Sequence, residues 1–362
     1  MRKAMAGLIV TIAVFGIVAA ACADTPLDRL IAGAKKEQKL TVTLFPRISP
    51  EVAAKMEAAF NARYGLSIKV EADLTGRYST KAAQGVIEQN TGAPPSYDVM
   101  VLPEAAFEVL DGAKAVEPIA DWDQMLPEGA DKTISPGPIQ GRGFIAYDLY
   151  WGFSYNSDKI ASADMPSTMP DFGKPQYKGK MAISDFATNW TYALMRYSPD
   201  EFLKIVAGWG ANQIVMMHPE QMAQHLALGE YSLGLDQTTE QVVSAQKAGQ
   251  NIKMAVWKDV VPHGVLVYAV RKGAKSPNAA KLFTLWLTGR EAVAFVGQST
   301  EVGSRLYAGS EAIDLALKLA GAAGVKPVGF FDSDETYKTL HWLGTKDGDD
   351  YNRKLTNAMR GQ

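Results

Sequence analysis

The hydrophobic pattern of the first hundred residues alternates between the period of a β-strand and the period of a helix. Residues 40–45, with the sequence Leu-Thr-Val-Thr-Leu-Phe, alternate apolar and polar side chains, and residues 66–72 and 98–102 are two more short strand-like runs. Apolar residues at helical spacing predict helices over 50–64 and 79–89 between them. Strands that alternate with helices at this spacing indicate βαβ units and a parallel sheet covered by helices.

The second half of the chain shows the same mixture of strands and helices after a connecting region. Residues 111–148 hold many Gly, Pro and Asp residues, and two strands are predicted at 143–147 and 151–155. Three further strands are predicted at 180–184, 231–235 and 265–270, and helices at 199–209, at 219–228 and from Pro277 onward. The pattern therefore predicts a second α/β unit, and we find no repeat of fixed period.

The N-terminus has the three parts of a secretory signal peptide. A basic start, Met-Arg-Lys, precedes the almost wholly apolar residues 4–21 and a small-residue stretch that ends before Asp24. We expect residues 1–23 to be cleaved, in preference to a membrane anchor formed by the same apolar run. Cys22 is the single cysteine, and two routes stay open for it: lipidation, or an Ala-Cys-Ala cleavage site that releases a free periplasmic protein, which we favour. Neither route leaves a disulfide in the mature chain.

Composition and charge exclude several classes of protein. With 47% hydrophobic and 21% charged residues, the 362-residue chain is globular and long enough for two domains with separate cores. Cleavage takes away Arg2 and Lys3 and no acid, which leaves 35 basic against 39 acidic residues and a net charge near −4. Since no basic run exceeds two residues, we expect neither a nucleic acid nor an anionic membrane surface as partner.

Four short motifs resemble those of one family of bacterial transport proteins. In chain order they are Gly-Phe-Ser-Tyr-Asn-Ser-Asp-Lys at 152–159, Lys-Gly-Lys at 178–180, Gly-Glu at 229–230 and Ser-Pro-Asn-Ala-Ala-Lys-Leu-Phe at 276–283. Together with residues 285–291, they are similar to motifs of the iron-, polyamine- and phosphonate-type extracellular solute-binding proteins of ABC importers. The resemblance covers essentially all of residues 24–310, in order.

The resemblance implies an α/β fold of the type II periplasmic binding proteins, a "Venus flytrap" with two Rossmann-like lobes joined by crossing strands. We expect a first lobe of residues 24–148 with 260–297, and a second lobe of 149–259 with the C-terminal helices of 298–362. Such a protein is expected to be a periplasmic monomer that closes on a small-molecule solute and delivers it to an ABC permease in the inner membrane. It requires no cofactor and no catalytic residue.

Polar loops at the carboxyl ends of the predicted strands are the candidate ligand contacts, because ligands of open α/β sheets bind there. Loops 45–49, 74–79 and 103–105 meet this condition in the first lobe. Arg47 and Arg77 lie beside predicted helix N-termini, where charge and helix dipole together favour an anion, so we favour a small organic or phosphorylated anion. The predicted contacts are Arg47, Ser49, Thr75, Gly76, Arg77, Tyr78, Ser79, Asp185, Thr188, Asn189, Trp190, Asp236, Thr238 and His263.

Two other ligand classes stay open for the same fold. The acids Asp185, Asp236 and Glu104 balance the two arginines in charge. A polyamine would suit Asp185 and Asp236 with the aromatic face of Trp190. Iron carriers of this type typically use adjacent tyrosines, but the sequence contains no Tyr-Tyr pair, so we predict no metal ligands.

A third alternative belongs to another class, a secreted α/β hydrolase. No phosphate-binding loop, G-x-S-x-G or H-E-x-x-H motif occurs, and no spacing singles out a catalytic triad. We therefore expect a binding protein and not an enzyme. A sensory module that hands its ligand to a receptor would share the fold.

Overall fold

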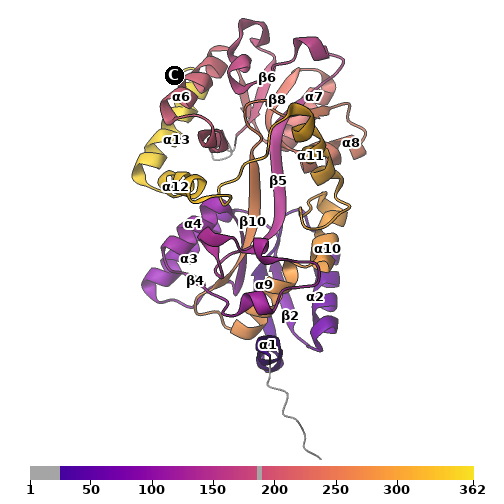
Figure 1. Cartoon of the computed structure of the whole chain (residues 1–362), viewed down its shortest axis with the longest axis vertical. Coiled ribbons are helices and arrows are strands. Elements are labelled where there is room, and N and C mark those ends of the chain that lie inside the picture. Colours follow the sequence, from indigo (N-terminus) through magenta and orange to yellow (C-terminus); the bar gives the residue numbers. More distant parts are fainter. Residues whose placement is uncertain (1–24, 186–189) are drawn as a thin grey trace, which may run out of the picture.

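The computed structural model describes residues 25–185 and 190–362. The predicted signal peptide with Cys22, and the predicted contacts Thr188 and Asn189, lie outside the described residues. Within the two described ranges, no helix is long and apolar enough to cross a membrane. The chain forms two lobes, one above the other in Figure 1, and a mixed sheet runs through both.

The first lobe is built on three parallel strands that alternate with helices, as the hydrophobic pattern predicts. β1 (Lys39–Thr43) lies between β2 (Lys69–Asp73) and β3 (Val99–Pro103). β10 (His263–Arg271) pairs antiparallel with β3, and the short β4 (Val116–Glu117) pairs with β10. The helices of this lobe are α1 (Pro26–Ala34), α2 (Pro50–Tyr64), α3 (Tyr78–Thr91), α4 (Glu104–Gly112), α9 (Pro277–Leu287) and α10 (Arg290–Thr300).

The second lobe has a smaller parallel set of strands. β6 (Met181–Ser184) lies between β7 (Val215–Met217) and β8 (Leu233–Thr238), and β9 (Lys253–Ala255) follows later in the chain. Its helices are α6 (Pro199–Ala211), α7 (Pro219–Leu228), α8 (Thr239–Lys247), α11 (Glu311–Ala323), α12 (Asp334–Leu343) and α13 (Lys346–Met359). A Cβ on Gly210 would lie 2.0 Å from the carbonyl oxygen of Ala358, so this glycine lets α6 and α13 meet backbone to backbone.

One long strand, β5 (Phe144–Tyr155), passes through both lobes. Its first part pairs with β10, and its second part pairs with β8 and β9. The sequence predicts two separate strands here, but Leu149 and Tyr150 continue the ladder opposite Gly264 and His263 and join them. β5 and β10 therefore form the connection between the lobes that is visible at the centre of Figure 1.

Two strand ends differ by three residues from their predicted positions. β2 begins at Lys69, three residues later than predicted, and β8 continues three residues beyond its predicted end to Thr238. The extension of β8 passes through an irregularity, because Gly152 pairs with Gln237 while Phe153 pairs with Leu235, which leaves Asp236 as an extra residue. The predicted lobe boundaries stay a prediction.

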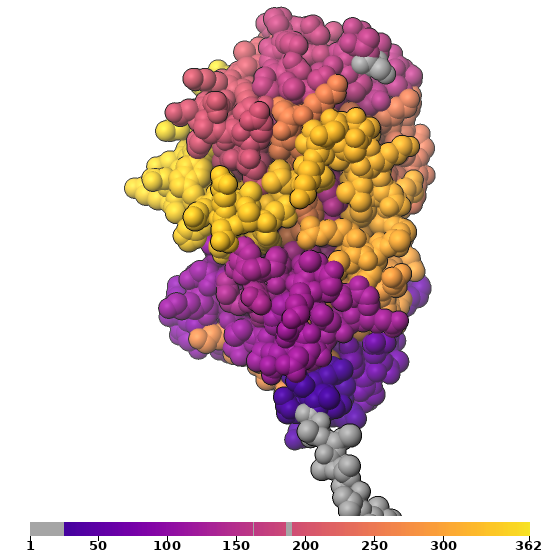
Figure 2. All heavy atoms as spheres, viewed as in Figure 1, coloured from indigo at the N-terminus to yellow at the C-terminus, as the bar shows by residue number. Residues whose placement is uncertain are grey.

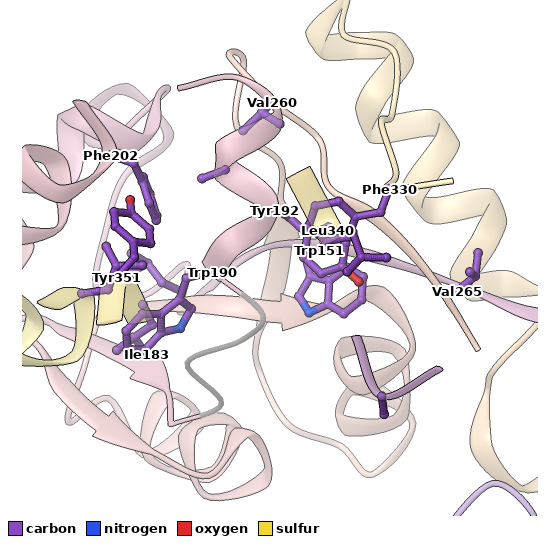
Figure 3. Close-up of a cluster of buried hydrophobic side chains, with 14 of the residues drawn as sticks. Trp151, Ile183, Trp190, Tyr192, Phe202, Val260, Val265, Phe330, Leu340 and Tyr351 are labelled. Atoms are coloured by element: carbon purple, nitrogen blue, oxygen red, sulfur yellow. The ribbon is translucent and has the colours of Figure 1, made fainter. Parts of the chain in front are cut away.

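Two large clusters of buried apolar side chains fill the molecule. One lies in the first lobe and includes Phe60, Phe283 and Trp286. The other contains Phe107 of α4 as well as many residues of the second lobe, so it continues across the lobe junction. Figure 3 shows part of this second cluster, in which Trp151 and Tyr192 lie beside Phe330. The two lobes are therefore in direct contact in this structure.

Candidate functional site between the lobes

Loops at the carboxyl ends of strands from both lobes meet at the junction. Arg47 follows β1 and contacts Glu240, which lies in the first turn of α8 after β8. Glu104 follows β3 and contacts Tyr192, which lies in a short 3-10 helix, η7 (Thr191–Met195), after β6. These four residues, with their immediate neighbours, are called the junction site below.

The first contact of the junction site is an ion pair between the lobes. Arg47 Nη2 lies 3.2 Å from Glu240 Oε1, and the same oxygen accepts a hydrogen bond of 2.6 Å from the hydroxyl of Thr238. Glu240 is only 3% exposed, and its second carboxylate oxygen has no hydrogen-bond partner in the described part of the chain. The guanidinium of Arg47 is thus occupied by a protein carboxylate in the closed arrangement.

The second contact is a hydrogen bond from the Tyr192 hydroxyl to the Glu104 carboxyl. Tyr192 is held between two rings, since Trp151 and Phe330 each stack on it at a centroid distance of 4.7 Å. Burial raises the pKa of Glu104 to about 8, although the hydrogen bonds from Tyr192 and from the Val265 N–H favour the carboxylate. Glu104 is therefore mostly protonated at neutral pH while the lobes are closed.

Asp236 contributes a third buried acid, held by unusual backbone geometry. It is the extra residue of the β8 irregularity, and its φ of 61° lies in the left-handed region that few non-glycine residues adopt. The strained conformation places an acidic residue at the strand end nearest the junction site, and such backbone strain is typical of functional positions. Its negative charge is one cause of the raised pKa of Tyr192.

A small pocket lined by aromatic rings lies beside Asp236. Its walls include Trp190, Phe202, Trp209 and Trp257, and its free space of about 10 Å³ is that of one water molecule. Trp209 donates its indole N–H to the Met169 carbonyl, whereas the indole N–H groups of Trp190 and Trp257 have no partner within the described ranges. Figure 3 shows Trp190 close to Ile183 and Phe202 in this region.

Tyr78 completes the first-lobe side of the site. Its hydroxyl is buried and has no hydrogen-bond partner in the two described segments. Burial raises the pKa of Tyr78 well above its ordinary value, while the charge of Arg47 acts in the opposite direction. Tyr78 therefore stays a neutral hydroxyl near Arg47.

A family model for bacterial extracellular solute-binding proteins matches residues 55–303, which is more than half of the chain. The chain belongs to the bacterial extracellular solute-binding protein family. No curated protein matches the sequence. Membership confirms the family that the four motifs suggested, and it supports an extracellular or periplasmic location.

Solved structures of ABC transporter binding proteins share the fold of this solute-binding protein. The substrate-binding protein of an ABC transporter from Agrobacterium tumefaciens has a TM-score of 0.69 at 12% identity, over 91% of this chain and 97% of that one. Iron-bound HitA from Pseudomonas aeruginosa has a TM-score of 0.67 at 18% identity, over 88% and 99% of the two chains. AfuA from Actinobacillus pleuropneumoniae, with fructose-6-phosphate bound, has a TM-score of 0.63 at 15% identity, over 89% and 99%. At these identities the likeness shows the fold alone, and it confirms the predicted two-lobed α/β class.

Several predicted contacts of the solute-binding protein have local roles in capping or turns. Ser49 caps α2 by accepting a hydrogen bond from the Val52 N–H, and Thr75 donates its hydroxyl to Asp73. Gly76 and Arg77 both have positive φ, and Arg77 precedes α3 as an exposed residue. Ser79 and Asp185 are also exposed. Their part in ligand binding stays a prediction.

His263 lies at the connection between the lobes, where its ring contacts the carboxylate of Asp148. Its Nε2 is 2.7 Å from the Asp148 carboxylate, and its ring stacks on Tyr150 at 4.7 Å. Burial opposes ionisation of Asp148, but the bond to His263 and the charges of His263 and Arg305 hold its pKa below the ordinary value. These contacts hold the imidazole of His263 in place at the connection between the lobes. Its part in ligand binding stays a prediction.

Sequence reasoning did not select Glu240 or Tyr192 as ligand contacts, and it weighed Glu104 only in the balance of charges. Glu240 lies two residues after the predicted contact Thr238, and a helix that starts at this point brings both side chains to one oxygen. The position of Tyr192 carries no comparable signal, since it depends on rings from β5 and from the C-terminal segment.

Proposed function

We propose that this protein is the substrate-binding component of an ABC importer, which closes its lobes on one small hydrophilic solute and delivers it to a membrane permease. The observation that carries the proposal is the pair of polar contacts between strand-end loops of opposite lobes, Arg47 with Glu240 and Glu104 with Tyr192. Polar groups that become buried only on closure can exchange these partners for groups of a ligand, and this favours closure around it. We expect a monomer that performs no catalysis.

The charge of the solute can be proposed from the same contacts. The sequence favoured an anion because of Arg47 and Arg77, but Arg47 is paired with Glu240 and Arg77 is exposed. Asp236 and Glu240 bring two buried carboxylates to the junction site, and Glu104 adds a third buried acid that burial keeps mostly protonated at neutral pH. Together with the ring of Trp190 beside Asp236, this balance favours a protonated amine over the organic or phosphorylated anion.

Ferric iron receives less support from these contacts. No group of three or more His, Cys, Asp or Glu side chains that could hold a metal ion occurs within residues 25–185 and 190–362. Iron therefore enters the test only as a comparison compound.

A thermal-shift screen with amines, organic acids, phosphate esters and ferric citrate tests the proposed function. We expect an amine to raise the melting temperature saturably, since a ligand at 100 times its Kd stabilises the folded state by about 2.7 kcal/mol. Asp236→Asn should weaken amine binding at least about tenfold in calorimetry, because a charged hydrogen bond is lost. Glu230→Gln is the matched control, since Glu230 lies on the surface beside His225.

Two outcomes would contradict the assignment. An anion that binds with an affinity dependent on Arg47 and independent of Asp236 would restore the anion hypothesis and reject the amine. Chemical conversion of any bound compound, followed by NMR of the ligand, would reject the proposal that the protein is a binder without catalysis.

We also propose that the protein is exported and loses residues 1–23. Expression with its own leader in a bacterial host is expected to yield a chain that begins at Asp24 and carries no lipid. Intact-mass spectrometry of the periplasmic fraction measures this directly. A membrane-bound product whose mass includes a lipid on Cys22 would show that the other processing route is used.

A further inference from the structure

One face of α4 is devoted to contacts across the lobe junction. Glu104, Phe107 and Glu108 lie three and four positions apart, so they share this face of the helix. Glu104 binds Tyr192, as described above, and the ring of Phe107 meets the ring of Phe331 edge to face at 6.3 Å. α4 belongs to the first lobe, so each of these contacts joins it to another part of the molecule.

Glu108 joins α4 to the C-terminal helix α12. The Tyr337 hydroxyl donates to one carboxylate oxygen at 2.7 Å, and His341 Nδ1 lies 2.7 Å from the other oxygen. The side chain of Glu108 is about 10% exposed, whereas that of His341 is 71% exposed. Both oxygens of a nearly buried carboxylate are thus used by a helix more than two hundred residues away in sequence.

α12 is also anchored in the second lobe, through α13. Trp342 of α12 packs against Tyr351 of α13 at 5.4 Å, and the Tyr351 hydroxyl donates to the Pro199 carbonyl at the start of α6. Gly210 lets α13 lie directly on α6. In Figure 2 the yellow C-terminal surface lies between the purple first lobe and the rose second lobe.

The segment that leads into α12 contacts both lobes with adjacent residues. Phe330 stacks on Tyr192 of the second lobe, and Phe331 meets Phe107 of the first. The segment is itself fixed to the connection between the lobes, because the His263 N–H donates to the Val328 carbonyl at 2.9 Å. Opening the lobes would separate Phe331 and α12 from α4.

We propose that residues 328–341 form a latch, anchored in the second lobe and closed on α4 of the first, which sets the balance between the open and closed lobes. The inference rests on the proposed function, since it concerns regulation of the same ligand site. The latch contacts are independent of any solute, so they favour the closed arrangement before a ligand arrives. Its loss lowers the apparent affinity for the solute in proportion to the closed fraction that is lost.

Distances between spin labels on Lys55→Cys and Lys204→Cys test the latch in the otherwise cysteine-free mature chain. Both residues are exposed and lie on α2 and α6, one in each lobe. Without ligand, we expect a short distance in the parent protein and, in Glu108→Ala, a shift of the closed-to-open ratio by roughly tenfold toward a longer distance. Tyr337→Phe should shift the closed-to-open ratio in the same direction by a smaller factor, because the contact between Glu108 and His341 remains.

Glu57→Ala is the matched control. Glu57 also accepts hydrogen bonds through its carboxylate, from the Val70 N–H and from Lys69, but all three residues belong to the first lobe. Circular dichroism verifies that each variant is folded.

Three results would overturn the latch: a parent protein that shows only the long distance, a Glu108→Ala protein with the parent's distances, or an equal shift in Glu57→Ala. None of these readings uses a solute, so failure of the latch is distinct from failure of the ligand screen.

Discussion

Arg271→Met is expected to destabilise the protein by about 3–5 kcal/mol, because it leaves the carboxylate of Glu88 buried without its charged partner. Arg271 Nη1 lies 3.1 Å from Glu88, and the two side chains are 2% and 4% exposed. The guanidinium also donates to the carbonyls of Gly85 and Ala115. A Cβ on Gly85 would lie 2.6 Å from Arg271 Nη1, which explains a glycine in the middle of α3. Urea unfolding followed by tryptophan fluorescence measures the loss.

Two further variants make this prediction specific. Arg353→Met removes an arginine whose side chain is 70% exposed, and it should cost less than about 1 kcal/mol. Adding Glu88→Gln to Arg271→Met removes the unpaired charge, so the double variant is expected to recover part of the loss. A cost below about 1 kcal/mol for Arg271→Met alone would show that solvent reaches Glu88.

Glu104→Gln is expected to match the parent protein at pH 5 and to be more stable at pH 9. The pKa of Glu104 rises from 4.5 to about 8 through burial in the closed protein. Because this pKa is raised, the contribution of Glu104 to the free energy of unfolding is complete below about pH 4.5 and is lost as the pH rises through 8. At 1.36 kcal/mol for each pKa unit, the free energies of unfolding of the variant and the parent should differ at pH 9 by on the order of a few kcal/mol. Melting temperatures of both proteins across this pH range measure it.

The groups around Glu104 decide how this experiment is interpreted. Tyr192 and the Val265 N–H donate to its carboxyl, and the charge of Asp332 acts on it from the C-terminal segment. Asp148 has a lowered pKa, so it affects stability in the opposite sense and only at acidic pH. The difference between parent and variant removes the histidine titrations that both proteins share. If the melting temperatures of the two proteins change equally with pH between pH 5 and 9, proton uptake at Glu104 is disproved.

The junction site shows why strand-end loops were predictable and their partners were not. The loops after β1, β2 and β3 follow from the strand and helix periods, and those after β1 and β3 contact the second lobe through Arg47 and Glu104. Arg47 was expected to serve a ligand, but the structure pairs it with Glu240, 193 residues further along the chain. Periodicity describes neighbours within one helix or strand, so it contains no information on such a pair.

The sequence by itself determined the α/β class, the order of most strands and helices, and the family through four short motifs. These depend on side chains a few residues apart, where backbone geometry fixes which positions share a face. Only the tertiary structure decided that one strand passes through both lobes, that His263 contacts the carboxylate of Asp148, and that Glu108 binds Tyr337 and His341 of the C-terminal helix α12. Each of the last two depends on a buried polar group from a distant segment, and burial makes a specific partner necessary whatever the sequence separation.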